Sequence, residues 1–131
     1  MKIMQKGINN ILYKEKEDYK MTYQELVEEI RKLYEEVDAS EIEEHFAIQI
    51  NINGEAEGAL YIEFADGQIE VQPYEYFDRD LIINTDFETA IDLANGDIEM
   101  SDAYAEEKIT VWGNLDKAIE IYETIFEKDR R

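Results

Sequence analysis

The first clear pattern along the chain is an apolar stripe with helical spacing, which begins after Thr22. Thr22 and Glu25 have the spacing of a capping box, in which a hydroxyl and a carboxylate satisfy the free amide groups at a helix start. The stripe recurs at every third or fourth position, as one buried face of a helix does. It consists of Tyr23, Leu26, Val27, Ile30, Leu33, Tyr34 and Val37. The sequence therefore predicts an amphipathic helix from Thr22 to Val37.

From His45 onward apolar residues recur at every second position, which is typical of half-buried strands. Asp66 and Gly67 give the strongest hairpin signal, because a type I′ turn needs positive φ at both central residues. Pro73 cannot donate a hydrogen bond to a neighbouring strand, so a strand should end there or lie at a sheet edge. The predicted strands are 46–52, 60–64, 69–71 and 81–84.

Helical spacing returns after the fourth strand. The segment 85–88 has the form of a second capping box, and Gly96 lies where a glycine commonly ends a helix. A helical turn at 101–105, a strand at 109–112 and a helix from Leu115 to Phe126 follow. One face of the strands is aliphatic and the other is mostly polar, so helices should cover only one face. We therefore predict an α+β domain, an antiparallel five-stranded sheet with helices packed on one face and enclosing an apolar pocket.

Length and charge narrow the class of protein. A chain of 131 residues is one domain with room for a core. Its 13 basic and 33 acidic residues give a net charge of −20, which repels nucleic-acid backbones and anionic lipid headgroups. We therefore expect no nucleic-acid partner and no stable membrane association. The chain has no cysteine and no apolar run long enough to span a bilayer, which favours a cytoplasmic protein.

Residues 1–20 differ from the rest of the chain in charge. They hold five lysines and three acidic residues, so the remaining residues carry the whole negative excess. Their weak apolar stripe is interrupted by Gly7 and by the pair Asn9 and Asn10. We interpret 1–20 as a loosely attached arm or a start assigned too early, with a membrane-touching helix as the alternative, and 21–131 as the domain.

The search for catalytic chemistry gives a negative result. His45 is the only histidine, and without cysteine it cannot anchor an ordinary zinc site. Asp78 and Asp80 diverge in an extended chain, which argues against a cation site. Gly54 and Gly58 flank a turn and do not open a helix, so they form no dinucleotide-binding loop. We expect a protein that is not an enzyme and that has no metal or cofactor.

The order of features between Asp80 and Ile119 carries a family resemblance. The residues are Asp80-Leu81-Ile82-Ile83-Asn84-Thr85, Phe87, Ile91, Gly96-Asp97-Ile98-Glu99, Ala103-Tyr104, Lys108-Ile109-Thr110-Val111, Gly113-Asn114 and Ala118-Ile119. With the helix and hairpin of the first half, this order resembles the sterol carrier protein 2 (SCP-2) sterol-binding domain over residues 22–126, as a small, stand-alone and acidic member. Met100 and Glu107 depart from the proline and glycine that members often have there. The acidity departs from the basic transfer domains, which affects bilayer transfer more than ligand binding.

The resemblance implies a cavity between sheet and helices for a fatty acid, a sterol-like molecule or another lipid, held for sequestration or carriage inside the cell. The helical residues expected to line it are Leu33, Val37, Phe87, Ile91, Met100, Tyr104, Leu115, Ile119, Tyr122 and Phe126. Tyr104 and Tyr122 could orient the ligand through their hydroxyls. The alternative is that all ten residues are ordinary core.

Two further readings of the function stay open. One is a protein-interaction or accessory module of the same fold, with a filled core and an acidic docking surface. Tyr61, Ile82 and Trp112 fall on the mostly polar sheet face, where a contiguous cluster would bind a partner protein or form a homodimer. The other is a small hydrolase with two carboxylates of raised pKa in one cleft.

Overall fold

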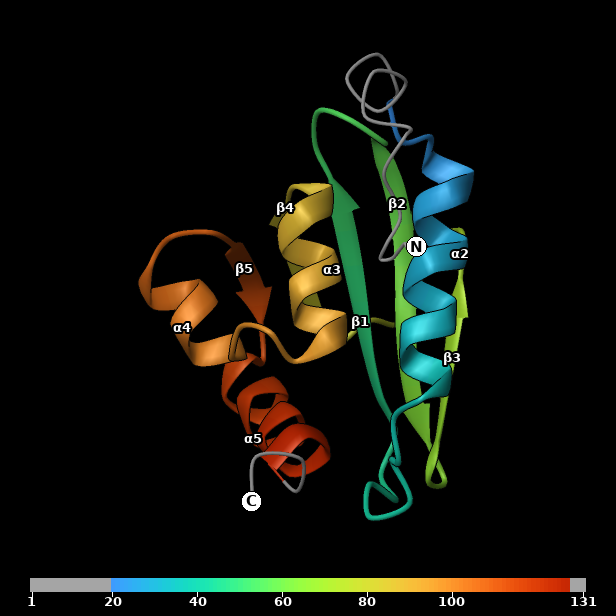
Figure 1. The fold of residues 1–131 in the computed structure, drawn as a ribbon. Coiled ribbons are helices and arrows are strands. Elements are labelled where there is room, and N and C mark those ends of the chain that lie inside the picture. The colour runs from blue at the N-terminus through green and yellow to red at the C-terminus, as the bar shows by residue number, and fades with distance from the viewer. Residues whose placement is uncertain (1–19, 128–131) are drawn as a thin grey trace, which may run out of the picture.

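The first helix has the start that the sequence predicts. The computed structural model describes residues 20–127, and its helix α2 spans Tyr23–Glu35 (Figure 1). The hydroxyl of Thr22 accepts a hydrogen bond from the Glu25 amide, and the Glu25 carboxylate accepts one from the Thr22 amide. The helix ends at Glu35, so Val37 follows it in the connection to the sheet.

Five strands form one sheet in the order β3-β2-β1-β4-β5. They are β1 (Phe46–Ile52), β2 (Gly58–Ala65), β3 (Gln68–Gln72), β4 (Leu81–Thr85) and β5 (Thr110–Gly113). β2 and β3 are joined by Asp66 and Gly67, whose φ angles of 54° and 80° are those that the hairpin prediction requires. The α+β class, the five strands and the hairpin are thus confirmed.

One of the four strand pairings differs from the predicted antiparallel arrangement. β1–β2, β2–β3 and β4–β5 are antiparallel, whereas β1 and β4 are parallel. The cause is the connection 73–80, which leaves the end of β3 and returns along the sheet to the other edge of β1. β4 therefore starts at the same end of the sheet as β1, and the sheet is mixed.

The second half of the domain contributes three helices. They are α3 (Phe87–Asn95), α4 (Met100–Ala105) and α5 (Leu115–Glu127). Asp86, one residue later than the predicted cap, accepts a hydrogen bond from the Thr89 amide, because the hydroxyl of Thr85 is used elsewhere. Gly96 ends α3 in the left-handed conformation with φ 77°.

The helices cover one face of the sheet. In Figure 1 α2 lies in front of β2 and β3, and α3 lies in front of β4 and beside β1. The two helices also contact each other. α5 reaches the same face, since the ring of Tyr122 contacts both Phe64 of β2 and Tyr34 of α2. Most helix-facing side chains of the strands are buried, such as Ile48 at 0% and Val71 at 4% exposure, whereas Ile69 and Val111 in the two edge strands are partly buried. The prediction of helices on one face is confirmed.

The described residues limit what else the chain contains. None of the helices within residues 20–127 is long and apolar enough to cross a membrane. The same range holds no group of three or more acidic or histidine residues that could bind a metal. The arm predicted at 1–20 lies outside the described residues apart from Lys20.

Candidate functional site

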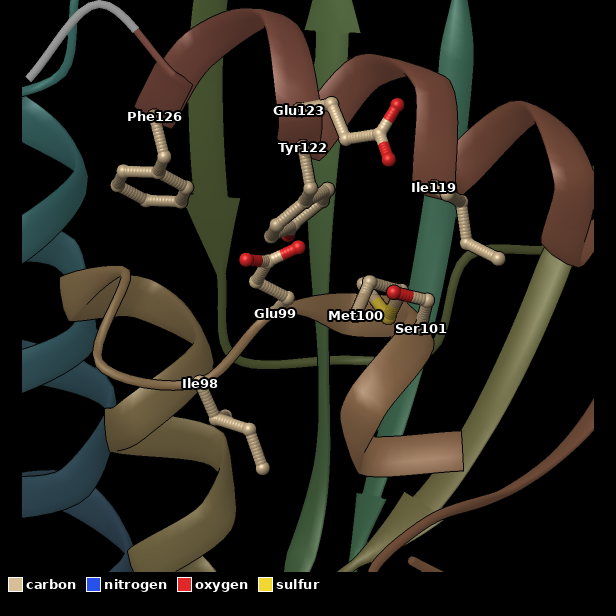
Figure 2. Close-up of a pocket in the computed structure, with 8 residues that line it drawn as sticks. All are labelled: Ile98, Glu99, Met100, Ser101, Ile119, Tyr122, Glu123 and Phe126. Atoms are coloured by element: carbon tan, nitrogen blue, oxygen red, sulfur yellow. The ribbon is translucent and has the colours of Figure 1, made fainter. Parts of the chain in front are cut away.

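A small pocket lies between the start of α4 and one face of α5 (Figure 2). Its lining residues are Ile98, Glu99, Met100, Ser101, Ile119, Tyr122, Glu123 and Phe126. The space in it that the centre of a water molecule can occupy is about 10 Å³. That is room for about one water molecule. The pocket in this conformation is therefore nearly closed, and its walls are packed against each other.

The end of α3 and the residue spacing along α5 place these walls. The left-handed Gly96 turns the chain out of α3, and the segment after it runs past α5 into α4. A Cβ atom at Gly96 would lie 2.7 Å from Cδ1 of Phe126, so the absence of a side chain is what lets the Phe126 ring seat there. Ile119, Tyr122 and Phe126 are spaced by three and four residues along α5, so they share the face that meets α4.

Tyr122, which lines the pocket, is hydrogen-bonded to a second buried tyrosine, Tyr34 of α2, which does not line it. The hydroxyls of Tyr34 and Tyr122 lie 2.5 Å apart, and both rings are about 4% exposed. The rings meet edge to face, and the Tyr122 ring also contacts Phe64 and Phe126. Burial in these apolar surroundings raises the pKa of Tyr122 and holds the pKa of Tyr34 well above its usual value. Both groups are therefore neutral phenols near neutral pH.

The charge around the pocket is entirely negative among the residues that line it. Glu99 and Glu123 are exposed lining residues, and Figure 2 shows Glu99 just before α4 and Glu123 on α5. The eight lining residues include no lysine, arginine or histidine. Ser101 adds a half-buried hydroxyl at the start of α4. The site thus combines an apolar floor, a neutral polar pair inside and an acidic rim.

The structure brings together four of the ten predicted lining residues. Met100, Ile119, Tyr122 and Phe126 line the pocket. The partly buried side chains that instead pack against the general core are Leu33, Val37, Phe87, Ile91 and Leu115. Tyr104 is 50% exposed and lies in a separate shallow groove beside β5.

Four lining residues were not predicted from the sequence. They are Ile98, Glu99, Ser101 and Glu123. Ile98 carried a usable signal, because an apolar residue two positions after a helix-ending glycine needs a partner to cover it. Glu99 and Glu123 gave no such signal, since acidic residues are common all along this chain.

The opposite face of the sheet carries exposed aromatic side chains. The strand register places Tyr61, Gln49, Ile82 and Trp112 in one row across four strands. Trp112 is 79% exposed, and Phe77 in the connection 73–80 is 97% exposed. The predicted trio therefore shares one face, although Gln49 separates Tyr61 from Ile82 in the row.

The connection 73–80 is fastened to this face by hydrogen bonds. The Tyr76 hydroxyl donates to the Glu63 carboxylate at 2.8 Å, and the Tyr76 amide donates to the Gln49 side chain. His45, for which the sequence suggested no role, contacts the same Glu63 carboxylate at 2.6 Å. His45 is thus an exposed member of the hydrogen-bonded cluster that holds this connection.

Comparison with known proteins agrees with the fold. A profile of the SCP-2 sterol transfer family matches residues 27–125. No curated protein matches the chain significantly. The structure of palmitated SCP2L2 from Aedes aegypti aligns over 80% of this chain and 95% of its own length, with 20% identity and a TM-score of 0.56. A crystal structure of sterol carrier protein 2 aligns over 79% of this chain and 88% of its own, with 12% identity and a TM-score of 0.52.

A larger protein contains a similar domain. A double mutant of the sec-alkyl sulfatase PisA1 aligns with 10% identity and a TM-score of 0.62. The match covers 80% of this chain but only 16% of the sulfatase, so the fold occurs both in small proteins and within an enzyme. Identities this low establish the fold, and the profile match over residues 27–125 establishes the family. The chain belongs to the SCP-2 sterol transfer family.

Proposed function

We propose that this chain is a non-enzymatic binder of one apolar lipid molecule, which it holds between the sheet and the helices α4 and α5. The observation that carries the proposal is the pocket between these helices, whose floor is apolar and whose lining includes the buried Tyr122. Family membership supports it, and so does the likeness to the palmitated SCP2L2 from Aedes aegypti. A cytoplasmic location stays a prediction from the composition.

Binding requires the pocket to expand, because a volume near 10 Å³ does not hold a lipid chain. α5 is the element best able to move. Its first turn is fixed, since the Asn114 amide donates to the Asp80 carbonyl at 3.0 Å and Lys117 pairs with Glu44. Its later turns are held mainly by apolar packing of residues such as Tyr122 and Phe126.

A pivot at the first turn of α5 would open the pocket without unfolding the helix. Each methylene group of the ligand that enters contributes about 0.8 kcal/mol of burial. A chain of several methylene groups therefore offsets the packing that is lost between α4 and α5. The mechanism is an exchange of one apolar contact surface for another.

The direct test is native mass spectrometry of the purified full chain, before and after incubation with mixed lipids. We expect a bound lipid at a ratio of one per chain. Ser101→Phe places a large ring at the pocket and should abolish the bound species. Ala105→Phe adds the same ring at an exposed position of the same helix and should leave binding intact. A wild-type chain that stays ligand-free, or equal binding by the two variants, would contradict the proposal.

The exposed aromatic face favours a second candidate function, which is recognition of a partner protein. Phe77, Trp112 and Tyr74 are 97%, 79% and 58% exposed on a molecule with a net charge of −20. A complementary partner would carry lysine or arginine around an apolar centre, because aromatic faces also attract cations. A lysine-rich amphipathic peptide should bind at low salt and lose affinity in Trp112→Ser. Absence of binding at low ionic strength would exclude this candidate.

A further inference from the structure

One of the two hydroxyl hydrogens in the buried tyrosine pair has no acceptor within the pair. Each phenol hydroxyl has one hydrogen to donate, and a single contact between two hydroxyls uses one of the two hydrogens. Within residues 20–127 the hydroxyls of Tyr34 and Tyr122 have no other hydrogen-bond partner. A buried donor without an acceptor is unfavourable, so this hydrogen needs a partner that the protein itself does not supply, such as a water molecule or a ligand.

The pocket is the place where this free donor can find an acceptor. Tyr122 lines the pocket, whereas Tyr34 lies behind it on α2. Figure 2 shows the Tyr122 ring projecting from α5 into the pocket. If Tyr34 donates to Tyr122, the Tyr122 hydrogen is left to face whatever enters. The Tyr34 bond also polarises the Tyr122 hydroxyl and makes it a stronger donor.

The charges around the pocket select the kind of acceptor. Glu99 and Glu123 line the pocket, and no cation occurs among the described lining residues. An ionised carboxylate or phosphate would meet like charges at the rim and would lose its hydration without gaining a counterion. A hydroxyl, ester or ketone oxygen accepts the same hydrogen bond and carries no charge.

We propose that the pocket selects neutral lipids with a single oxygen-bearing head, which enter head first and accept a hydrogen bond from Tyr122. The inference rests on the proposed lipid-binding function and names its ligand class. Ser101 at the start of α4 offers a second neutral hydroxyl nearer the opening. Anionic lipids such as free fatty acids are disfavoured by the same surroundings, unless they bind protonated.

The test compares ligands that share one tail and differ in the head. Diphenylhexatriene, a fluorescent hydrocarbon, reports the apolar pocket, and its displacement from the full chain is measured with dodecanol, methyl laurate and laurate at pH 8. We expect dodecanol and methyl laurate to bind at least about fivefold more tightly than laurate. Laurate binding as tightly as dodecanol would overturn the inference.

Variants then assign the selectivity to the tyrosine pair. Tyr122→Phe should weaken the binding of dodecanol and methyl laurate by about fivefold more than it weakens the binding of diphenylhexatriene, since only the two oxygen-bearing ligands lose a hydrogen bond. Tyr34→Phe should cause a smaller loss, because Tyr122 keeps its hydroxyl. Tyr104→Phe removes an exposed hydroxyl and should change nothing.

The failures of the two proposals look different. Unchanged dodecanol affinity in Tyr122→Phe would overturn the role of the pair while lipid binding stands. A wild-type chain that binds neither diphenylhexatriene nor any of the three lipids would overturn the proposed function itself.

Discussion

Replacement of Gly96 by alanine tests how α5 packs, because the added Cβ atom would be unfavourable for two separate reasons, the backbone conformation and a steric clash. Gly96 has a φ of 77°, and a Cβ atom there would lie 2.7 Å from Cδ1 and 3.0 Å from Cγ of Phe126. Gly54 has a nearly equal φ of 82°, but a Cβ atom there would meet nothing within 4 Å. The two glycines therefore share the backbone cost of alanine, and only Gly96 adds a clash.

The magnitudes follow from these contacts. Alanine in the left-handed conformation costs about 1 kcal/mol, so Gly54→Ala should lower the free energy of unfolding by about that amount. Truncation of a buried phenylalanine costs about 3–5 kcal/mol, and partial displacement of the Phe126 ring should cost about 1–2 kcal/mol. Gly96→Ala should therefore lower stability by about 2–3 kcal/mol in total.

Urea unfolding of the two variants measures the difference, provided that the slope with denaturant stays the same. Combining Gly96→Ala with Phe126→Leu adds a second check, since a shorter side chain leaves room for the new methyl group. In that background the stability lost on Gly96→Ala should fall toward the stability lost on Gly54→Ala. Equal losses at Gly96 and Gly54 in the wild-type background would refute the role of the Phe126 contact.

Three other substitutions test single contacts. Thr22→Ala removes the helix cap of α2 and should lower the urea-derived stability by about 1 kcal/mol. Thr85→Val removes a buried hydroxyl that donates to the Lys108 carbonyl at 2.8 Å, and urea unfolding should show a loss of about 1–3 kcal/mol. The hydrogen bond to Glu63, together with burial, raises the pKa of Tyr76 to about 12. This pKa in the folded protein lies above the ordinary value of 10.0, so the stability that it provides is present below pH 10 and is lost as the pH rises toward 12. The difference in unfolding free energy between wild type and Tyr76→Phe should therefore narrow between pH 10 and pH 12.

Conservative variants separate these effects from general damage. Thr22→Ser and Thr85→Ser keep the hydroxyl and should retain most of the stability. A loss in Thr22→Ser as large as in Thr22→Ala would contradict the cap, and full stability in Thr85→Val would contradict the buried hydrogen bond. A gap between wild type and Tyr76→Phe that stays constant from pH 8 to pH 12 would contradict the raised pKa.

Local chemistry made much of the fold predictable. Thr22 with Glu25 predicted the start of α2, and Asp66 with Gly67 predicted the turn between β2 and β3. Each prediction depends only on neighbouring residues, because the first pair caps free amides at a helix start and the second adopts the positive φ angles of a tight turn. The family resemblance was also confirmed, because it depended on the order of such local elements. Gly96 likewise ended α3 where the sequence suggested.

Pairing between distant segments could not be predicted in the same way. A strand of alternating residues looks the same whether its neighbour is parallel or antiparallel, so the β1–β4 pairing had no sequence signal. The stripes of α2 and α5 show which face of each helix is buried but not which residue opposes it. Tyr34 and Tyr122 are 88 positions apart, and their contact follows only from the assembled layers. Tyr104 belongs to a helix of six residues, which is too short to define a buried side.

The parallel pairing of β1 with β4 has a consequence for how copies of the chain can exchange parts. β1 is central, and its second edge is completed only by residues that lie beyond the connection 73–80. Until β4 arrives, that edge presents unpaired backbone groups that any other copy of β4 fits equally well. We therefore expect the connection to act as the hinge if copies of the chain swap domains, with β4 through α5 of one chain completing the sheet of another. Shortening 73–80 should trap interlocked dimers, since a shorter hinge cannot carry β4 back to its own sheet.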